Sequence, residues 1–342
     1  MMWAASFSCQ WRSALAQSQT LLAQSRWSPC LYSYLVSAHL IMIQDSGLSL
    51  TQEEEEELPR LMAAIPGLKQ RIAGKSLPME KYAIRKAERW TAQGGRLTLP
   101  GLELVYLWNG FSIMGLDYTR AERYLVTIEA EMEAAQRRRA AGGQEQFEVE
   151  DDCLLLLLKG MCLKYMSAPM GAEECFREVI NKAGCEGAKL KADKYLLPYA
   201  TVELALILME AGDNEEAASL LEAAKGYKEY SLQSRLHFRI HAAQNKILAG
   251  NNNNEEQEKV SKVYVVMSPL SINHLGTRRD AQFQRGQGEN TQGPGKLFRI
   301  ATQRIGSSYL NLFPSQHSSV SFIVNFFVKI PHKVRVIFIY VV

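Results

Sequence analysis

The 342-residue sequence has few of the short patterns that mark catalytic or metal sites. None of its six cysteines has the CxxC spacing of a zinc ribbon or a thioredoxin-like redox site. The phosphate-loop pattern GxxxxGK(S/T) and the nucleophile pattern GxSxG are absent. Because nothing places a nucleophile, a base and an orienting group together, we predict a non-enzymatic protein with no cofactor and no metal.

Long apolar runs and a strong excess of charge are also missing. The best candidate for a membrane span, 320–342, is interrupted by basic residues and Pro331, so we predict no transmembrane segment. The formal net charge is +3, but 1–250 holds 28 basic and 31 acidic residues, whereas 251–342 holds 11 and 5. The acidic balance of the first block argues against a nucleic-acid partner. All the cysteines lie in that block without a disulfide pattern, which favours a cytoplasmic protein.

Helical periodicity dominates residues 10–250. Ser28 followed by Pro29 predicts a helix start, and Thr51 with Glu54 has capping-box spacing. We expect further helices over 10–22, 78–90, 102–114 and 117–139, one capped by Asp151 or Asp152, three around 172–180, 202–208 and 217–224, and a last one from about 231 to 249 with Gly250 just past its end.

Pairs of these helices share a spacing. A small residue is followed twelve residues later by an alanine and four residues after that by a large apolar residue. The copies are Gly160, Ala172 and Phe176; Ala205, Ala217 and Leu221; and, more loosely, Asn109, Ala121 and Leu125. Small residues let two helix backbones approach, and the bulky residue fills the groove beside them. A generic helical bundle is the alternative, but the repetition favours an all-α solenoid of tetratricopeptide-like hairpins over 10–250.

Several stretches carry a resemblance to a known family. They are SRWSPCLYSYLVSAHL (25–40), AGKSLPMEKYAIRKAERW (73–90), LPGLELVYLWNGFSIMG (99–115), DDCLLLLLKGMCLKYM (151–166) and the long stretch 191–243. Within them, LWNGF and SRLHFRIHAA are distinctive. On these residues the block resembles the C-terminal half of a tetratricopeptide repeat protein 39 family member. The resemblance implies that an N-terminal portion with further repeats is missing.

The resemblance also implies a function. Family members act as scaffolds or adaptors for protein partners. They are linked to lipid and cholesterol homeostasis, through turnover of a sterol-sensing nuclear receptor, and to cilium assembly. Stacked hairpins form a concave surface suited to a peptide or helix. We expect six helix positions to line a partner groove: Asn109, Ser112, Lys159, Leu163, Glu203 and Leu208.

Other interpretations stay open. A lipid- or membrane-associated protein would bind peripherally, through a pocket between hairpins or through the basic apolar tail. His237 and His241 have a zinc-compatible spacing, but no third ligand is evident and the glutamate of the metalloprotease motif is missing. Trp27, Trp90 and Trp108 could form a ligand cage, although core packing is favoured.

Residues 251–342 match nothing in the family. Residues 251–315 are rich in polar residues and glycine without a sustained period, which predicts disorder. Residues 334–342 form an apolar, β-prone run. We therefore predict that 251–342 is a low-order basic tail, an alternative C-terminus rather than a domain.

The first helix is expected to lie at an exposed end of the solenoid. Terminal repeats need a polar outer face, whereas Trp11, Leu15 and Leu22 are apolar. We therefore expect marginal stability or self-association.

Overall fold

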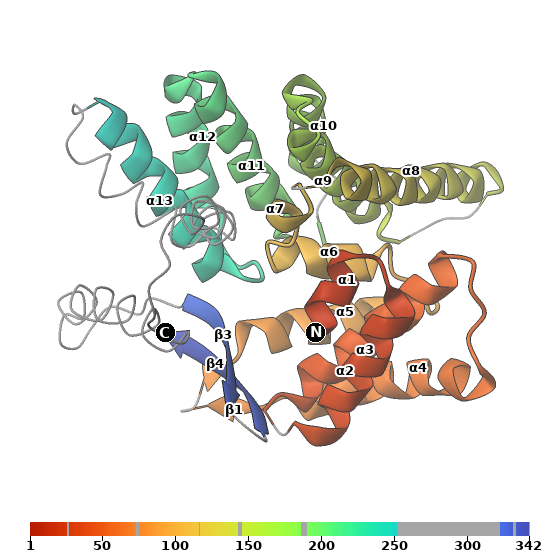
Figure 1. The fold of residues 1–342 in the computed structure, drawn as a ribbon. Helices are drawn as coiled ribbons and strands as arrows, with labels where there is room; N and C mark the ends of the chain where they lie inside the picture. The colour runs from red at the N-terminus through yellow and green to blue at the C-terminus, as the bar shows by residue number, and fades with distance from the viewer. Residues whose placement is uncertain are drawn as a thin grey trace, which may run out of the picture. The chain divides into compact units, whose positions relative to one another are not determined.

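A computed structural model describes residues 1–25, 27–72, 75–115, 117–142, 146–185, 190–251, 322–330 and 333–341. The chain divides into two compact units, Met1–Asn251 and Asn252–Val342, and each is described by itself. The first is built from helices (Figure 1). In chain order they are α1 (Met2–Phe7), α2 (Trp11–Gln24), α3 (Pro29–Asp45), α4 (Gln52–Ala64), η1 (Ile65–Leu68), α5 (Pro78–Ala92), α6 (Pro100–Leu107), α7 (Phe111–Met114), α8 (Tyr118–Ala140), α9 (Glu148–Tyr165), α10 (Pro169–Gly184), α11 (Leu196–Ala211), α12 (Asn214–Gly226) and α13 (Gln233–Asn251).

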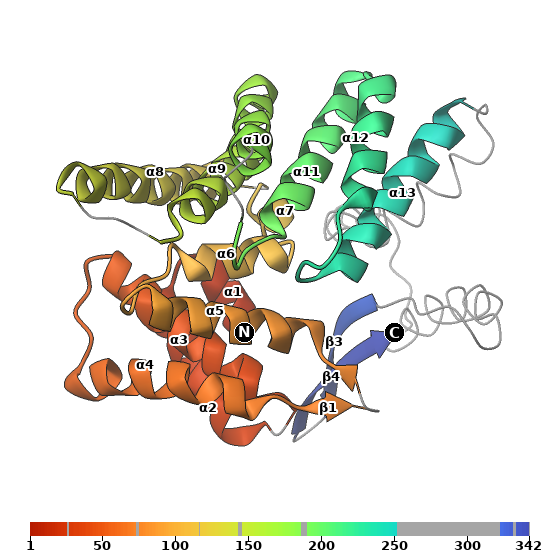
Figure 2. The same ribbon diagram turned by 180° about the vertical axis from the view of Figure 1, so that it is seen from behind.

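A short antiparallel pair, β1 (Arg71–Ile72) and β2 (Lys75–Ser76), precedes α5. In both views α6 lies between the group α1–α5 and the row α8–α13 (Figures 1 and 2). Within that row, α9 packs on α10 and α11 packs on α12, and α10 also contacts α11. The predicted all-α fold of tetratricopeptide-like hairpins is therefore confirmed for the helical unit.

The predicted caps form where local sequence is sufficient. The Ser28 hydroxyl accepts a hydrogen bond from the Leu31 amide at the start of α3. Thr51 and Glu54 form a complete capping box at the start of α4. Each pair satisfies backbone N–H groups that the first helical turn leaves unpaired.

Three predicted helix boundaries are wrong. The expected helix over 102–114 is broken because Asn109 adopts a left-handed conformation (φ 59°) between α6 and α7. Asp151 and Asp152 lie inside α9 instead of capping it. Gly250 lies within α13, which runs to Asn251. In the second case the reason is tertiary, since the Asp151 carboxylate binds Arg89 of α5.

The first helices are more buried than we expected. The helix α1 was not predicted, yet it packs on α2 and on α6. Trp11 and Leu15 are buried, and Leu22 is half-buried. Because α2 lies along α3, Trp11 and Leu15 enter the core instead of forming an exposed apolar end.

A buried histidine joins these first three helices. His39 of α3 lies with its Nε2 3.0 Å from the Ser6 hydroxyl of α1 and its Nδ1 2.9 Å from the Ser18 hydroxyl of α2. All three side chains are buried. Burial lowers the pKa of His39 to about 3, because the charged imidazolium would lose its hydration.

We expect acid to weaken the helical unit through His39. The unfolded chain binds a proton at about pH 6.5 and the folded chain only near pH 3, so stability contributed by neutral His39 is present above pH 6.5 and is lost as the pH falls towards 3. At pH 5 this loss is about 2 kcal/mol. Urea unfolding at pH 7.5 and pH 5 should show a smaller pH dependence in His39→Gln than in the original chain. An equal pH dependence in both proteins would contradict the assignment.

The second unit has one described feature, an antiparallel hairpin. Strand β3 (Phe322–Ile330) pairs with β4 (Lys333–Val341), from Phe322↔Val341 to Ile330↔Lys333. The β-prone run expected at 334–342 thus falls largely on β4. The expectation of disorder over 251–315 concerns residues that, beyond Asn251, lie outside the described part of the chain.

Candidate functional site

Two repeat triplets lie at close helix crossings. Gly160 of α9 and Ala172 and Phe176 of α10 are all buried. A Cβ atom added to Gly160 would lie 2.5 Å from Cε1 of Phe176, so glycine is needed for this approach. The second triplet, Ala205 of α11 with Ala217 and Leu221 of α12, is also fully buried.

The third triplet is arranged differently. Ala121 of α8 is buried and Leu125 is half-buried, but Asn109 is exposed in the break between α6 and α7. Gly110 is the buried small residue here, and a Cβ atom on it would lie 2.5 Å from Cε1 of Phe7. The structure therefore places the close approach against α1 instead of α8.

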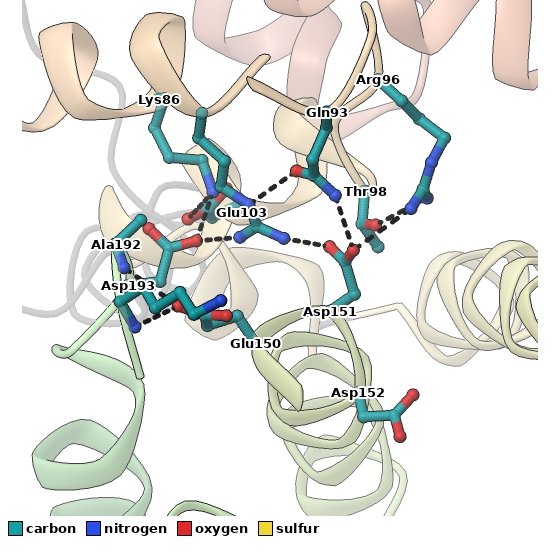
Figure 3. A network of polar contacts seen from close by, with 12 residues as sticks. Lys86, Gln93, Arg96, Thr98, Glu103, Glu150, Asp151, Asp152, Ala192 and Asp193 are labelled. Atoms are coloured by element: carbon teal, nitrogen blue, oxygen red, sulfur yellow. Dashed lines mark hydrogen bonds and ion pairs between the residues drawn. The ribbon is translucent and has the colours of Figure 1, made fainter. Parts of the chain in front are cut away.

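A cluster of buried charges lies between α5, α6, α9 and the segment that precedes α11 (Figure 3). The Lys86 ammonium of α5 lies 2.8 Å from Glu103 of α6 and 2.9 Å from Asp193, which precedes α11. The Arg89 guanidinium of α5 lies 2.5 Å from Asp151 of α9 and also binds Asp193. These five side chains, at most 3% exposed, form what we call the ionic cluster. It ties α5 and α6 to the first helices of both hairpins.

Further hydrogen bonds complete the ionic cluster. The Tyr195 hydroxyl donates to Glu103 at 2.5 Å. The segment that carries Asp193 is held by Glu150, whose carboxylate accepts hydrogen bonds from the backbone amides of Lys191 and Ala192. These bonds fix the position of Asp193 before α11 begins.

Burial and ion pairing shift the pKa values of Glu103 and Asp193 in opposite directions. Burial raises the pKa of Glu103 above its ordinary value, and Lys86 offsets this only in part. Burial would also raise the pKa of Asp193, but Lys86 and Arg89 together hold it below the ordinary value. A charge buried here without its partner would be costly, so the cluster is suited to holding helices together.

Sequence reasoning missed the ionic cluster, although a signal was present. Glu103 interrupts the apolar stretch 99–107, and Asp193 directly precedes the apolar start of α11. A charged residue inside an apolar run needs a buried partner of opposite charge. That partner lies far along the chain, so spacing alone does not reveal it.

A second polar contact closes the expected partner groove. Glu203 of α11 is buried and accepts hydrogen bonds from the Tyr106 hydroxyl of α6 at 2.9 Å and from Arg239 of α13 at 2.7 Å. Burial would raise the pKa of Glu203, but Arg239 and Lys164 hold it below the ordinary value. This inner face is therefore occupied by the chain's own α6.

The six expected groove residues do not share one open face. Glu203 and Leu208 are buried. Asn109 and Ser112 lie together at the break before α7, where the Ser112 hydroxyl donates to the Asn109 carbonyl. Lys159 of α9 pairs with Glu129 of α8 at 2.9 Å.

The last of the six, Leu163, lies one turn further along α9, next to the start of α10. A Cβ atom on Gly171 would lie 3.2 Å from its Cδ1. Lys159 and Leu163 are one helical turn apart, so they are the two expected groove residues that share a face.

Three exposed apolar side chains lie on α8 and α10, the two helices that pack on α9. Tyr118 and Val126 of α8 are 62% and 61% exposed, and Met170 of α10 is 84% exposed. They are three of the seven large apolar side chains that are exposed in the described residues. Val126 lies one turn before Glu129, the partner of Lys159. Met170 adjoins Gly171, where an added Cβ atom would lie 3.2 Å from Leu163. We call Tyr118, Val126, Lys159, Leu163 and Met170 the α8–α10 surface.

Two of the three tryptophans considered as a ligand cage make packing contacts. Trp108 stacks on Trp3 with ring centroids 4.5 Å apart, and Trp90 packs against Gly95. Burial and the neighbouring His241 lower the pKa of His237. Within the described ranges, no group of three or more His, Cys, Asp or Glu side chains is placed to hold a metal ion. None of the described helices combines the length and the apolar character needed to cross a bilayer.

Stacked antiparallel helix pairs with a small residue at each crossing define a helical-repeat protein of the tetratricopeptide class. Residues 1–166 match the model of the Iml2/Tetratricopeptide repeat protein 39 family. The chain is 34% identical over 246 residues to Tetratricopeptide repeat protein ttc-39B of Caenorhabditis elegans. The chain therefore belongs to the tetratricopeptide repeat protein 39 family.

The alignment with that relative covers 71% of this chain and 39% of the relative. The chain thus spans well under half the length of the curated relative it matches. No solved structure matches the chain.

Proposed function

We propose that the chain is a non-enzymatic interaction scaffold whose protein partner binds the α8–α10 surface. The observation that carries the proposal is the exposure of Tyr118 and Val126 on α8 and of Met170 at the start of α10, the two helices that pack on α9. Clustered exposed apolar residues are typical of interaction sites in proteins of this size. The repeat class supports the same function, because helical repeats commonly present extended binding surfaces.

The character of the surface indicates the kind of partner. Apolar side chains on α8 and α10 flank the Lys159–Glu129 ion pair. A partner helix with an apolar stripe and a polar edge would bury the first and pair with the second. The inner face is a poorer candidate, because Tyr106 and Arg239 already saturate Glu203.

The family resemblance supports finer roles, which we propose on that basis. They are adaptor functions in lipid and cholesterol homeostasis, including turnover of a sterol-sensing nuclear receptor, or in cilium assembly, and a cytoplasmic location. The identity of the partner separates them. Some partners will no longer bind when the α8–α10 surface is altered. A sterol-responsive receptor among them would favour the first role, and a ciliary component would favour the second.

We expect Val126→Glu combined with Met170→Glu to weaken partner binding by about tenfold or more, because both changes place an unpaired charge in a desolvated contact. Proximity labelling should first identify partners, and titration with the purified partner should then measure affinity. Leu48→Glu is the matched control, since Leu48 is 53% exposed and lies between α3 and α4. Unchanged affinity in a folded double variant would refute the proposed surface.

Lys159 and Glu203 are the two charged residues of the expected groove. Charge reversal tests partner binding at Lys159 only. Lys159→Glu breaks a half-exposed ion pair, which costs roughly 0–1 kcal/mol, so the variant should stay folded. Glu203→Lys would place a second cation against the half-buried Arg239, in the buried position of Glu203. Loss of binding in that variant would report unfolding instead of a partner contact.

A further inference from the structure

The hairpin β3–β4 has an unequal distribution of charge along its length. Its three basic residues occupy three successive register pairs beside the connection: Val328↔Arg335, Lys329↔Val334 and Ile330↔Lys333. The other six pairs, from Phe322↔Val341 to Phe327↔Val336, contain no charged residue, and 322–342 contains no acidic residue. One end of the hairpin is therefore cationic and the rest is uncharged.

Both faces of the hairpin are apolar in sequence. Directly opposed residues of an antiparallel pair share a face, and successive pairs alternate between faces. One face has the pairs Val324↔Ile339 and Phe326↔Ile337. The other has Phe327↔Val336 and Asn325↔Phe338, in which Asn325 is the polar residue. A sheet that is half exposed to water would instead alternate apolar and polar residues. An isolated two-stranded ribbon is at best marginally stable in water, so both faces call for an apolar environment.

We propose that this hairpin is a membrane-surface anchor for anionic phospholipids. At the boundary between headgroups and acyl chains, apolar side chains of a ribbon can leave water while the unpaired N–H and C=O groups along its two edges still reach headgroups and water, which the hydrocarbon core does not allow. The basic residues beside the connection would lie among anionic headgroups, to which each adds attraction. The excess of 11 basic over 5 acidic residues in 251–342 acts in the same direction. Apolar insertion and electrostatic attraction together give stable peripheral binding where one alone is weak.

The experiment is flotation of the full chain with vesicles of phosphatidylcholine, with and without phosphatidylserine. We expect binding to the phosphatidylserine vesicles, weakened by salt, and little binding to phosphatidylcholine alone. Neutralising Lys329, Lys333 and Arg335 together to Gln should lower the affinity by roughly a hundredfold. The matched control neutralises three exposed basic residues of the helical unit, Arg60, Arg137 and Lys225, and should change the affinity little.

A second variant tests the apolar part. Replacing both residues of the Phe326↔Ile337 pair with Ser keeps every charge, and it should also release the chain from the vesicles. Three results would overturn the proposal: equal binding to both vesicle types, equal effects of the hairpin and control neutralisations, or binding that survives the serine variant. A second copy of the chain, bound to the hairpin by strand pairing, is the alternative to a membrane. Centrifugation without vesicles tests this alternative. Sedimentation of the chain alone would assign the hairpin to a second copy and overturn the proposal.

Discussion

Replacing Arg89 with Met is expected to lower the free energy of unfolding of the helical unit by about 3–5 kcal/mol. The change leaves Asp151 and Asp193 buried without the cation that faces both of them. Methionine keeps part of the apolar contact with Phe147, whose ring lies 4.9 Å from the guanidinium. The loss therefore comes from two buried carboxylates that keep one cation each, Lys86 for Asp193 and Arg96 for Asp151, and not from an emptied space. Urea unfolding followed by circular dichroism measures it.

Two further variants separate charge from geometry. Arg89→Lys keeps the charge but cannot reach both carboxylates with a planar fork, so its loss should be intermediate. Arg12→Met removes an exposed pair with Glu54 and should cost less than about 1 kcal/mol. If Arg89→Met were no more destabilising than Arg12→Met, the ionic cluster would not hold the helices together.

The ionic cluster also determines which surfaces can bind a partner. It joins α5, α6, α9 and the segment before α11 through side chains that are almost entirely buried. Separating α6 from the repeats would expose these charges and the Tyr106–Glu203 hydrogen bond. Because breaking buried pairs is expensive, a peptide cannot easily displace α6. The partner that we propose would instead use a surface that α6 does not cover, such as the α8–α10 surface.

The contrast between predicted and observed features follows from the range of the interactions. Ser28 caps α3 and Thr51 caps α4 through residues within four positions, so local sequence was sufficient to predict both. Asp151 has the same capping chemistry, but its carboxylate binds Arg89, 62 residues away. A single sequence contains no information on that pairing, and the helix start was therefore misplaced.

The same reasoning explains the partner groove. Spacing correctly put Gly160 and Phe176 at a crossing, because a close approach of neighbouring helices requires a small residue. Spacing also selected Glu203 of α11 for the groove, but it did not reveal that Tyr106 of α6 lies against this side chain. Glu203 was therefore expected to face a partner, whereas it accepts a hydrogen bond from Tyr106.

The crossing of α9 and α10 gives the second large effect. Phe176→Ala is expected to cost about 3–5 kcal/mol, because the ring is fully buried and its loss leaves a cavity. Gly160→Ala should cost about 1–3 kcal/mol through overpacking, since its new Cβ would lie 2.5 Å from the Phe176 ring. The better helix propensity of alanine recovers about 0.5–1 kcal/mol of this.

Together the two changes should cost less than the sum of the separate losses, because the methyl group of Gly160→Ala enters space that the ring has left. We expect a coupling of about 0.5–3 kcal/mol, the range for residues in contact. Urea unfolding of the four proteins of this cycle measures it. Ala205→Gly with Leu221→Ala on the next hairpin is the comparison, since neither of these changes introduces a clash. Strict additivity at Gly160 and Phe176 would mean that the small residue is not there to admit the ring, and the steric basis of the repeat would fail at the crossing that defines it best.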